Sequence, residues 1–142
     1  DYFYIIWENI FMKKISDSLI IEKKSKFYGF MYTLENENEV SVILNKLKSE
    51  HKKARHICYA YKIGVIERKN EDKEPSNTAG LPILEVIKRN NLDNTLIVVV
   101  RYFGGTLLGR GLLTRTYSKC ACFLIKNKWV HFCIKYISNK TN

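Results

Sequence analysis

The segment from Thr95 to Tyr117 most constrains how this chain can fold. Its first six residues, Thr95 to Val100, form an uninterrupted β-branched and apolar run. A run of this length suits a strand that is buried on both faces. Arg101 and the glycine pair Gly104 and Gly105 follow this run, so the strand should deliver polar groups to one edge of a sheet.

The residues after this strand have the pattern of a glycine-rich turn that leads into a helix. Gly109 and Gly111 flank Arg110, and helical spacing then places apolar side chains on one face. These side chains are Leu112, Leu113, Tyr117, Ala121, Leu124 and Ile125. The unpaired backbone amides at the start of such a helix point back toward the turn and can bind an anion. We therefore expect the functional site at this junction of strand, turn and helix.

Three ordered blocks of the chain carry distinctive motifs. Residues 55–61 read RHICYAY, residues 74–84 read EPSNTAGLPIL, and residues 101–118 read RYFGGTLLGRGLLTRTYS. Together these blocks resemble the signature of the Impact family, which contains bacterial proteins of unknown function and eukaryotic translation regulators. The resemblance implies the fold of the second domain of ribosomal protein S5. It also implies that bacterial relatives continue into a second, small α+β domain.

The strand pattern predicts an α+β domain with one sheet and helices in two layers. The predicted strands cover residues 19–21, 26–33, 56–63 and 95–100. Gly64 should bend the chain before a further short strand at Val65 and Ile66. The alternation of Val130, Phe132, Ile134 and Tyr136 predicts one more strand near the end of the chain.

Two helices are predicted before the central strand. The first begins at Asn36, with Glu39 three residues later completing a capping box. The second covers residues 82–90, because Pro82 suits a first helical turn. Residues 67–80 lie before this second helix and contain few apolar side chains, which indicates a charged loop.

A chain of 142 residues has room for one hydrophobic core. We expect the Impact-like domain at residues 12–127, an extension at residues 1–11, and a tail at residues 128–142 that begins a second domain or is its remnant. The extension is aromatic and apolar, but Glu8 interrupts it and it is shorter than the roughly 20 residues that cross a bilayer. No membrane association is therefore expected.

The charge balance favours polyanionic or acidic partners. The chain has 24 Lys and Arg residues against 14 Asp and Glu residues, a formal net charge of +10. The four cysteines lack the spacing of a disulfide framework, which indicates a reducing cytoplasm. Cys120 and Cys122 would point about 200° apart on a helix, so they should not bind a shared zinc ion.

The glycines around Arg110 do not form a known nucleotide-binding motif. In a phosphate-loop alignment Arg110 replaces the lysine and Gly111 replaces the hydroxyl that binds Mg²⁺. A dinucleotide fingerprint fails as well, because Thr114 stands where a third small residue is needed. We expect no cofactor and no bound metal.

Basic and aromatic residues at the junction instead favour binding to a partner. The candidate binding residues are Arg55, His56, Arg101, Tyr102, Phe103, Gly104, Gly105, Arg110 and Arg115. The basic side chains could bind RNA phosphates while Tyr102 or Phe103 stacks on bases. Because Arg110 and Arg115 lie about 140° apart on a helix, we expect a broad basic surface and not a narrow pocket. The competing interpretation is an ordinary solvated helix face.

The charged loop is a second candidate site, through Asp72, Glu74, Ser76 and Thr78. Its acidic groups could bind a cation or a basic partner. A different class of function, a small hydrolase, would use Cys58 as nucleophile with His56 and a carboxylate from Asp72 or Glu74. Against the hydrolase, a cysteine between Ile57 and Tyr59 is more often a buried filler.

We therefore expect a cytoplasmic, non-enzymatic regulator of translation that binds RNA or the ribosome through a basic surface. The family resemblance implies an alternative, a protein-binding module. Eukaryotic relatives bind the coactivator of an amino-acid-starvation kinase and restrain the activation of that kinase, which would link the domain to a stress response.

Overall fold

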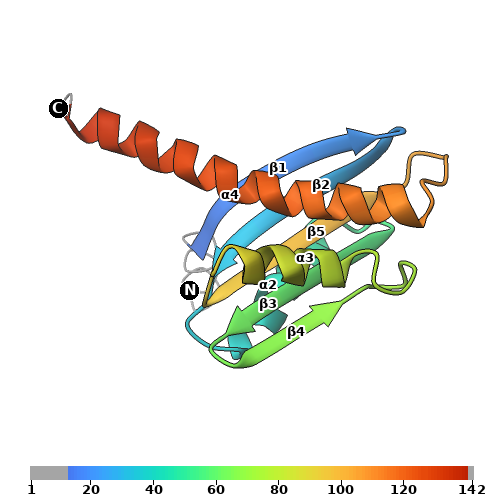
Figure 1. Ribbon diagram of the computed structural model, residues 1–142, viewed down its shortest axis with the longest axis horizontal. Helices are drawn as coiled ribbons and strands as arrows, with labels where there is room; N and C mark the ends of the chain where they lie inside the picture. Colours follow the sequence, from blue (N-terminus) through green and yellow to red (C-terminus); the bar gives the residue numbers. More distant parts are fainter. Residues whose placement is uncertain (1–12, 141–142) are drawn as a thin grey trace.

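Residues 13–140 are described by a computed structural model, and within them five strands form one antiparallel sheet (Figure 1). The strands are β1 (Lys14–Glu22), β2 (Ser25–Thr33), β3 (His56–Ile63), β4 (Ile66–Asn70) and β5 (Thr95–Tyr102). Their order across the sheet is β1-β2-β5-β3-β4, and each neighbouring pair is antiparallel. The last strand in the sequence therefore lies at the centre of the sheet.

β5 is the buried strand that the β-branched run predicts. Every residue from Thr95 to Arg101 is buried. Side chains alternate between the two faces of a strand, so Leu96, Val98 and Val100 join one core cluster while Ile97 and Val99 join the other. The strand extends two residues beyond its predicted end, which brings Arg101 into the sheet.

Helices cover both faces of the sheet (Figure 1). On one face lies α2 (Asn38–Glu50), which packs through Val40, Ile43, Leu44 and Leu47. On the other face lie α3 (Gly80–Arg89) and α4 (Arg110–Lys140). The α+β class expected from the sequence is confirmed, and α2 adds a third layer because both faces of β5 are apolar.

The first half of α4 packs along β1 and β2, as the predicted apolar face requires. Leu113, Tyr117 and Leu124 are buried. The Tyr117 ring meets the Phe27 ring edge-on, with 5.2 Å between the centroids. Gly29 of β2 permits the close approach, because a Cβ atom there would lie 2.9 Å from Cys120 Sγ.

The start of α2 differs from the predicted capping box. The helix begins at Asn38, and its cap residue Glu37 forms no side-chain cap hydrogen bond. Glu37 instead accepts a hydrogen bond from Tyr61 Oη at 2.6 Å. Glu39 binds Lys13 and accepts from the backbone amide of Glu35, so the two acidic side chains connect α2 to neighbouring segments.

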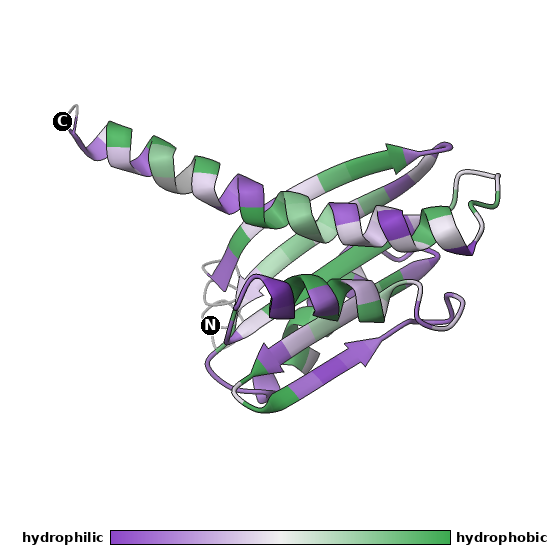
Figure 2. Cartoon of the chain, in the orientation of Figure 1, coloured by the Kyte–Doolittle hydropathy of each residue, from purple (hydrophilic) through white to green (hydrophobic). Residues whose placement is uncertain are grey.

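The predicted loop at residues 67–80 is shorter than expected, because it begins with most of β4. Gly64 forms the predicted bend with φ of 58°, and Ile66–Asn70 then pairs with β3 as a hairpin. β4 is an edge strand made mostly of hydrophilic residues (Figure 2). Charged edge strands resist pairing with other chains, and their lack of apolar residues makes them resemble loops in sequence.

Glu71 directly follows β4, and its side chain caps the N-terminus of α3. Its carboxylate accepts hydrogen bonds from the backbone amides of Ala79, Gly80 and Leu81, at 2.8, 2.7 and 3.2 Å. Partial burial alone would raise the pKa of Glu71, but hydrogen bonds from Lys69 and from these amides outweigh it and lower the pKa below its ordinary value of 4.5. A carboxylate at a helix N-terminus also interacts favourably with the helix dipole.

Glu71→Gln is therefore expected to lower the free energy of unfolding by about 1 kcal/mol at neutral pH. Because the folded-state pKa of Glu71 is lowered, its charge contributes stability above the ordinary value of 4.5. That contribution is lost as the pH falls through the folded-state pKa, so the two proteins should converge in acid. Urea denaturation at neutral and acidic pH measures the difference, with Glu85→Gln on the exposed side of α3 as the control. A constant difference across this range would contradict the assignment.

The strand predicted from the alternation near the end of the chain is wrong. α4 continues without interruption to Lys140. No glycine or proline occurs between Leu112 and Lys140 to end the helix. Val130, Ile134 and Ile137 also fit helical spacing, and all three are exposed on the part of α4 that extends beyond the sheet (Figure 1).

The extension predicted at residues 1–11 lies outside the described residues. Between residues 13 and 140, no helix combines the length and the apolar character that crossing a membrane requires.

Candidate functional site

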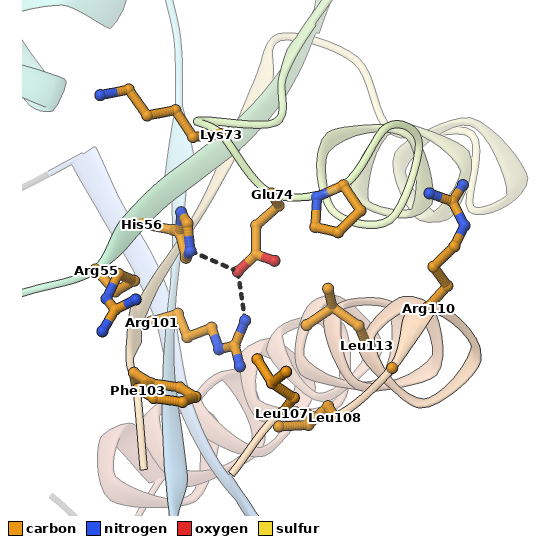
Figure 3. Close-up of a pocket in the computed structure, with 12 residues that line it drawn as sticks. Arg55, His56, Lys73, Glu74, Arg101, Phe103, Leu107, Leu108, Arg110 and Leu113 are labelled. Atoms are coloured by element: carbon orange, nitrogen blue, oxygen red, sulfur yellow. Dashed lines mark hydrogen bonds and ion pairs between the residues drawn. The ribbon is translucent and has the colours of Figure 1, made fainter. Parts of the chain in front are cut away.

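A pocket of about 310 Å³ opens where β3 begins, β5 ends and α4 begins (Figure 3). Its rim carries exposed cationic side chains, its walls are largely apolar, and a carboxylate lies inside. The lining residues are Arg55, His56, Lys73, Glu74, Pro75, Arg101, Phe103, Leu107, Leu108, Gly109, Arg110 and Leu113. The junction predicted from the sequence is therefore a concave site, and it includes part of the charged loop.

Glu74 is the central polar group of this pocket. It is only 6% exposed, although it belongs to a segment that the sequence indicates as a polar loop. One carboxylate oxygen, Oε1, accepts from Arg101 Nη1 at 2.6 Å and from Tyr117 Oη at 3.1 Å, and it lies 3.2 Å from His56 Nε2. A buried carboxylate requires such partners, because an unpaired one would be costly to remove from water.

The loop between β4 and α3 presents Glu74 because Asp72 fixes it to the start of β3. Asp72 Oδ2 accepts from the backbone amide of Ile57 at 2.6 Å. His56 Nδ1 donates to the carbonyl oxygen of Asp72 at 2.7 Å. The His56 ring thus lies between the carbonyl oxygen of Asp72 and the Glu74 carboxylate. Asp72 and Lys73 have positive φ values of 41° and 67°, which gives the tight turn that brings Glu74 inward.

Arg101 does not form the phosphate contact that its sequence position suggests. Its side chain is buried, with the residue 5% exposed, and its guanidinium lies between the Phe27 and Phe103 rings, at 5.3 and 5.8 Å from their centroids. Its charge is directed to Glu74. Arg101 therefore acts inside the protein, where it holds the Glu74 carboxylate in place at the pocket.

The remaining arginines separate into those at the rim and one outside it. Arg55 is exposed, and its guanidinium stacks 4.7 Å from the centroid of the Phe103 ring. Arg110 donates to the carbonyl oxygen of Ser76 at 2.8 Å, which holds the charged loop beside the start of α4. Arg115 is exposed on α4 and does not line the pocket. Arg110 and Arg115 therefore do not line the same pocket, as their spacing on the helix requires.

Two of the other predicted residues, Thr78 and Gly104, have structural contacts. Thr78 Oγ1 donates to the carbonyl oxygen of Pro75 at 2.6 Å, within the turn that enters α3. Gly104 packs against the turn between β1 and β2, and its amide donates to Ser25 Oγ at 3.1 Å. Gly105 is exposed with φ of 91°. Most polar groups of the charged loop therefore bind other residues of this chain and are not free for a partner.

A second hollow of about 590 Å³ lies beside the pocket and shares Phe103 with it. Its lining is basic and aromatic, and consists of Lys24, Lys26, Tyr28, Glu50, His51, Tyr102 and Phe103. Tyr102 Oη and His51 Nδ1 share a hydrogen bond of 2.6 Å. Burial raises the pKa of Tyr102, so its hydroxyl stays protonated at neutral pH. The two hollows together form what we call the Phe103 face.

Sequence reasoning missed several residues of the Phe103 face. Lys24 and Lys26 lie in and after the turn between β1 and β2, far from the predicted junction in sequence. Lys73 lies within the charged loop but is not among the predicted binding residues. The pairing of β2 with β5, which places Lys26 opposite Tyr102, brings Lys24 and Lys26 to this face. Only the strand order could have shown that Lys24 and Lys26 lie beside Tyr102.

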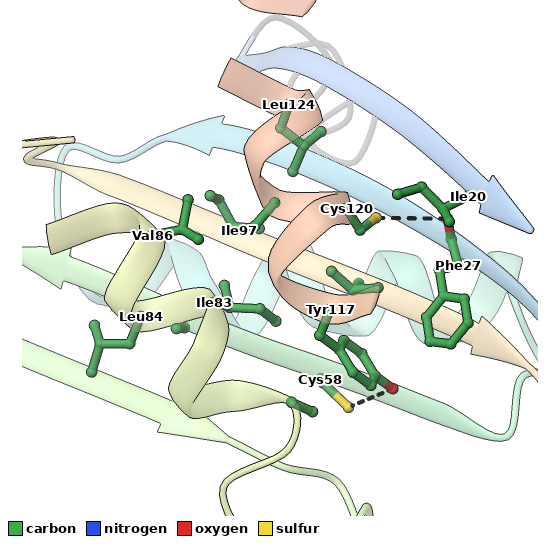
Figure 4. Packing of buried hydrophobic residues seen from close by; sticks show 14 of the residues in the cluster. Ile20, Phe27, Cys58, Ile83, Leu84, Val86, Ile97, Tyr117, Cys120 and Leu124 are labelled. Carbon is green, nitrogen blue, oxygen red and sulfur yellow. Dashed lines mark hydrogen bonds between the residues drawn. The ribbon is translucent and has the colours of Figure 1, made fainter. Parts of the chain in front are cut away.

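Cys58 lacks the features of a nucleophile. It is fully buried, and its thiol contacts Tyr117 Oη at 3.4 Å and the carbonyl oxygen of Glu71 at 3.2 Å (Figure 4). Burial raises the pKa of the Cys58 thiol far above its ordinary value, so it carries no thiolate at neutral pH. The structure thus gives the hydrolase alternative no activated thiol at Cys58.

Cys58 should resist alkylation in the folded protein, whereas the exposed Cys133 should react. A short pulse of iodoacetamide at neutral pH, followed by peptide mass spectrometry, measures both sites at once. The same pulse in denaturant should modify both cysteines equally. Rapid modification of Cys58 without denaturant would restore the hydrolase hypothesis.

Residues 23–125 match the Impact N-terminal domain, and the chain belongs to the Impact family. It is 42% identical over 111 residues to the IMPACT family member YvyE of Bacillus subtilis, covering 76% of this chain and 51% of that protein. The chain thus spans about half the length of the curated relatives it matches.

Solved structures show the same fold. A crystal structure of a hypothetical protein aligns with a TM-score of 0.76 at 28% identity, covering 78% of this chain and 56% of that chain. The two-domain translational regulator Yih1 aligns with a TM-score of 0.51 at 22% identity, covering 79% of this chain and 47% of that chain. The likeness to Yih1 concerns the fold alone.

Proposed function

We propose that this domain acts in cytoplasmic translation by binding RNA, free or within the ribosome, through the Phe103 face. The observation that carries this proposal is the meeting of two hollows at Phe103, with exposed cations around both. These cations are Lys24, Lys26, Arg55, Lys73 and Arg110. Membership of the Impact family, together with the fold shared with the translational regulator Yih1, supports a role in translation.

The charges of this face favour a polyanion. The Glu74 carboxylate is paired with Arg101, so it does not offset the cations at the rim. Glu50 is the remaining acidic residue in the lining of the two hollows. Lysine and arginine side chains that neutralise phosphates release counterions, which supplies affinity without sequence specificity.

The aromatic residues of the same face suit single-stranded RNA. Phe103, Tyr28 and Tyr102 line the hollows between the cations. Proteins that bind single strands combine a cationic track for the backbone with aromatic rings on which bases stack. Arg55 adds a planar guanidinium already stacked on Phe103. We propose a binding function without catalysis, and the buried Cys58 supports that choice.

A protein partner is the second candidate, and one observation favours it. Leu107 is 82% exposed at the edge of the pocket, close to the partly exposed Phe103. Exposed aliphatic and aromatic side chains beside a cleft are typical of protein interfaces. An acidic protein segment could then occupy the same face.

Binding of fluorescent single-stranded RNA, measured by anisotropy at low salt, tests the proposal. The triple variant Lys24→Gln, Lys26→Gln, Arg55→Gln is expected to bind about tenfold more weakly or worse, because each lost phosphate contact removes counterion release. The matched control is Arg68→Gln, Lys88→Gln, Arg89→Gln, which removes the same charge from exposed positions on β4 and α3. The control should retain affinity within about twofold, since non-contacting charges act only at long range.

Two results would overturn RNA binding through this face. Equal weakening of both triple variants would show that overall charge, and not the Phe103 face, attracts RNA. No binding by the unaltered protein even at low salt would reject RNA and leave the protein partner, for which Leu107→Asp is the diagnostic variant.

A further inference from the structure

The Glu74 carboxylate has one oxygen that the fold does not use. Its Oε1 atom takes the contacts from Arg101, Tyr117 and His56. No hydrogen bond from residues 13–140 reaches the other oxygen, Oε2, which points into the pocket (Figure 3). A carboxylate oxygen accepts strongly, and a buried one gains when a donor arrives with a ligand.

The charges around Oε2 determine whether the donor of a ligand can be cationic or must be neutral. The negative charge of Glu74 is already matched by Arg101 at 2.6 Å. The rim adds the exposed cations Arg55, Lys73 and Arg110. An ammonium or guanidinium donor would therefore enter a region of positive charge and be repelled. A neutral N–H donor joined to an anionic group would satisfy both Oε2 and the rim.

The walls and size of the pocket suit a flat, weakly polar ring. Phe103, Leu108 and Leu113 supply apolar surface around the carboxylate. The volume of about 310 Å³ is at the lower end of the roughly 300–1,000 Å³ typical of small-molecule sites. It has room for one nucleotide unit and not for a duplex. A nucleotide carries a neutral base with N–H donors and an anionic phosphate.

We infer that the pocket takes one unstacked base of the bound RNA strand and selects bases with an exocyclic amino group. Glu74 Oε2 accepts from the amino group of cytosine, adenine or guanine, while the phosphates lie against Arg55, Lys73 or Arg110. Carboxylates read the cytosine amino group in this way in other complexes. Uracil has no amino group, and its one ring N–H donor lies between two carbonyl oxygens that would be brought close to the carboxylate. This inference rests on the proposed RNA binding.

Competition between short single-stranded RNAs and a fluorescent RNA tests the inference without altering the protein. The competitors are oligo(C), oligo(U) and an oligo(C) whose amino nitrogens carry two methyl groups and thus no hydrogen. Oligo(C) is expected to compete about tenfold better than either of the others, the scale of one hydrogen bond to a charged group. Dimethylation keeps the ring and its stacking, so a difference in competition between the two forms of oligo(C) reports the amino hydrogens alone.

A protein variant gives an independent arm. Glu74→Gln retains the shape of the side chain but can present an amide N–H to the pocket, so the preference for oligo(C) over oligo(U) should shrink or reverse. Its folding is checked by circular dichroism and thermal unfolding. If the variant does not fold, the competition experiment with the unaltered protein alone tests base selection.

The outcomes separate this inference from the proposed function. Equal competition by oligo(C) and oligo(U), with binding still lost in the Lys24, Lys26, Arg55 triple variant, would overturn base selection and leave RNA binding intact. Equal competition by oligo(C) and its dimethylated form would assign any preference to stacking and overturn the role of Glu74. No RNA binding at all would overturn both proposals.

Discussion

Arg101→Met is expected to lower the free energy of unfolding by about 3–5 kcal/mol, the cost of leaving a buried charge without its partner. Arg101 Nη1 lies 2.6 Å from Glu74 Oε1, and the Glu74 side chain is almost fully enclosed. Methionine preserves packing between Phe27 and Phe103 but cannot compensate the carboxylate. Urea denaturation followed by circular dichroism measures the loss.

Arg115→Met is the matched control, because Arg115 is exposed on α4. Its effect should stay within about 0.5 kcal/mol, as for most surface substitutions. Combining Arg101→Met with Glu74→Gln should cost less than the sum of the two single changes, because neither charge then remains unpaired. A loss below about 1 kcal/mol for Arg101→Met would contradict a buried, paired guanidinium.

Gly104→Ala is expected to destabilise the fold by about 3 kcal/mol, since overpacking against a fixed backbone costs roughly 1–3 kcal/mol and occasionally more. A Cβ atom at Gly104 would overlap the backbone of Lys24 and Ser25 in the turn between β1 and β2. The turn would have to move away from the end of β5, which also breaks the hydrogen bond from the Gly104 amide to Ser25 Oγ. Chemical denaturation measures the loss.

Gly105→Ala provides the comparison within the same glycine pair. Gly105 has φ of 91°, but a Cβ atom there would meet nothing within 4 Å. Its cost should therefore be the backbone strain alone, about 1–2 kcal/mol. A larger loss for Gly105→Ala than for Gly104→Ala would contradict the packing of the β1–β2 turn against Gly104.

The features that sequence predicts well are local. The β-branched run at Thr95 to Val100 forms the central strand, and the apolar spacing after Gly111 forms the buried face of α4. The boundaries of β3 agree with the prediction, because Arg55 precedes the strand and Gly64 follows it. In each case the pattern and its end signals lie within a few neighbouring residues.

The central contact of the site depends on residues far apart in sequence. Arg101 is charged and directly follows the apolar run at Thr95 to Val100, so the sequence predicts that it is exposed. Its burial depends on Glu74, 27 positions earlier. Lys24 reaches the same face only because β2 pairs with β5. Residue patterns report which side chains are polar, but strand order decides which of them meet.

Some local patterns fit two structures equally well. β4 carries charged side chains at a sheet edge, and such a strand has the composition of a loop. The alternating residues after Lys128 satisfy both strand and helix spacing, and the helix forms because nothing in the sequence ends it. Pairing with β3 decides the first case, and the absence of a helix-ending residue decides the second.

The salt dependence of RNA affinity tests the central claim most directly, because it counts the cations that meet phosphates. For single strands, the logarithm of affinity falls with the logarithm of salt concentration by about 0.7 per neutralised phosphate. If Lys24, Lys26 and Arg55 each contact a phosphate, replacing all three by glutamine should reduce this slope by about 2. The control triple variant on β4 and α3 should keep the slope of the unaltered protein. An unchanged slope in the first variant would contradict the proposal that the Phe103 face binds RNA.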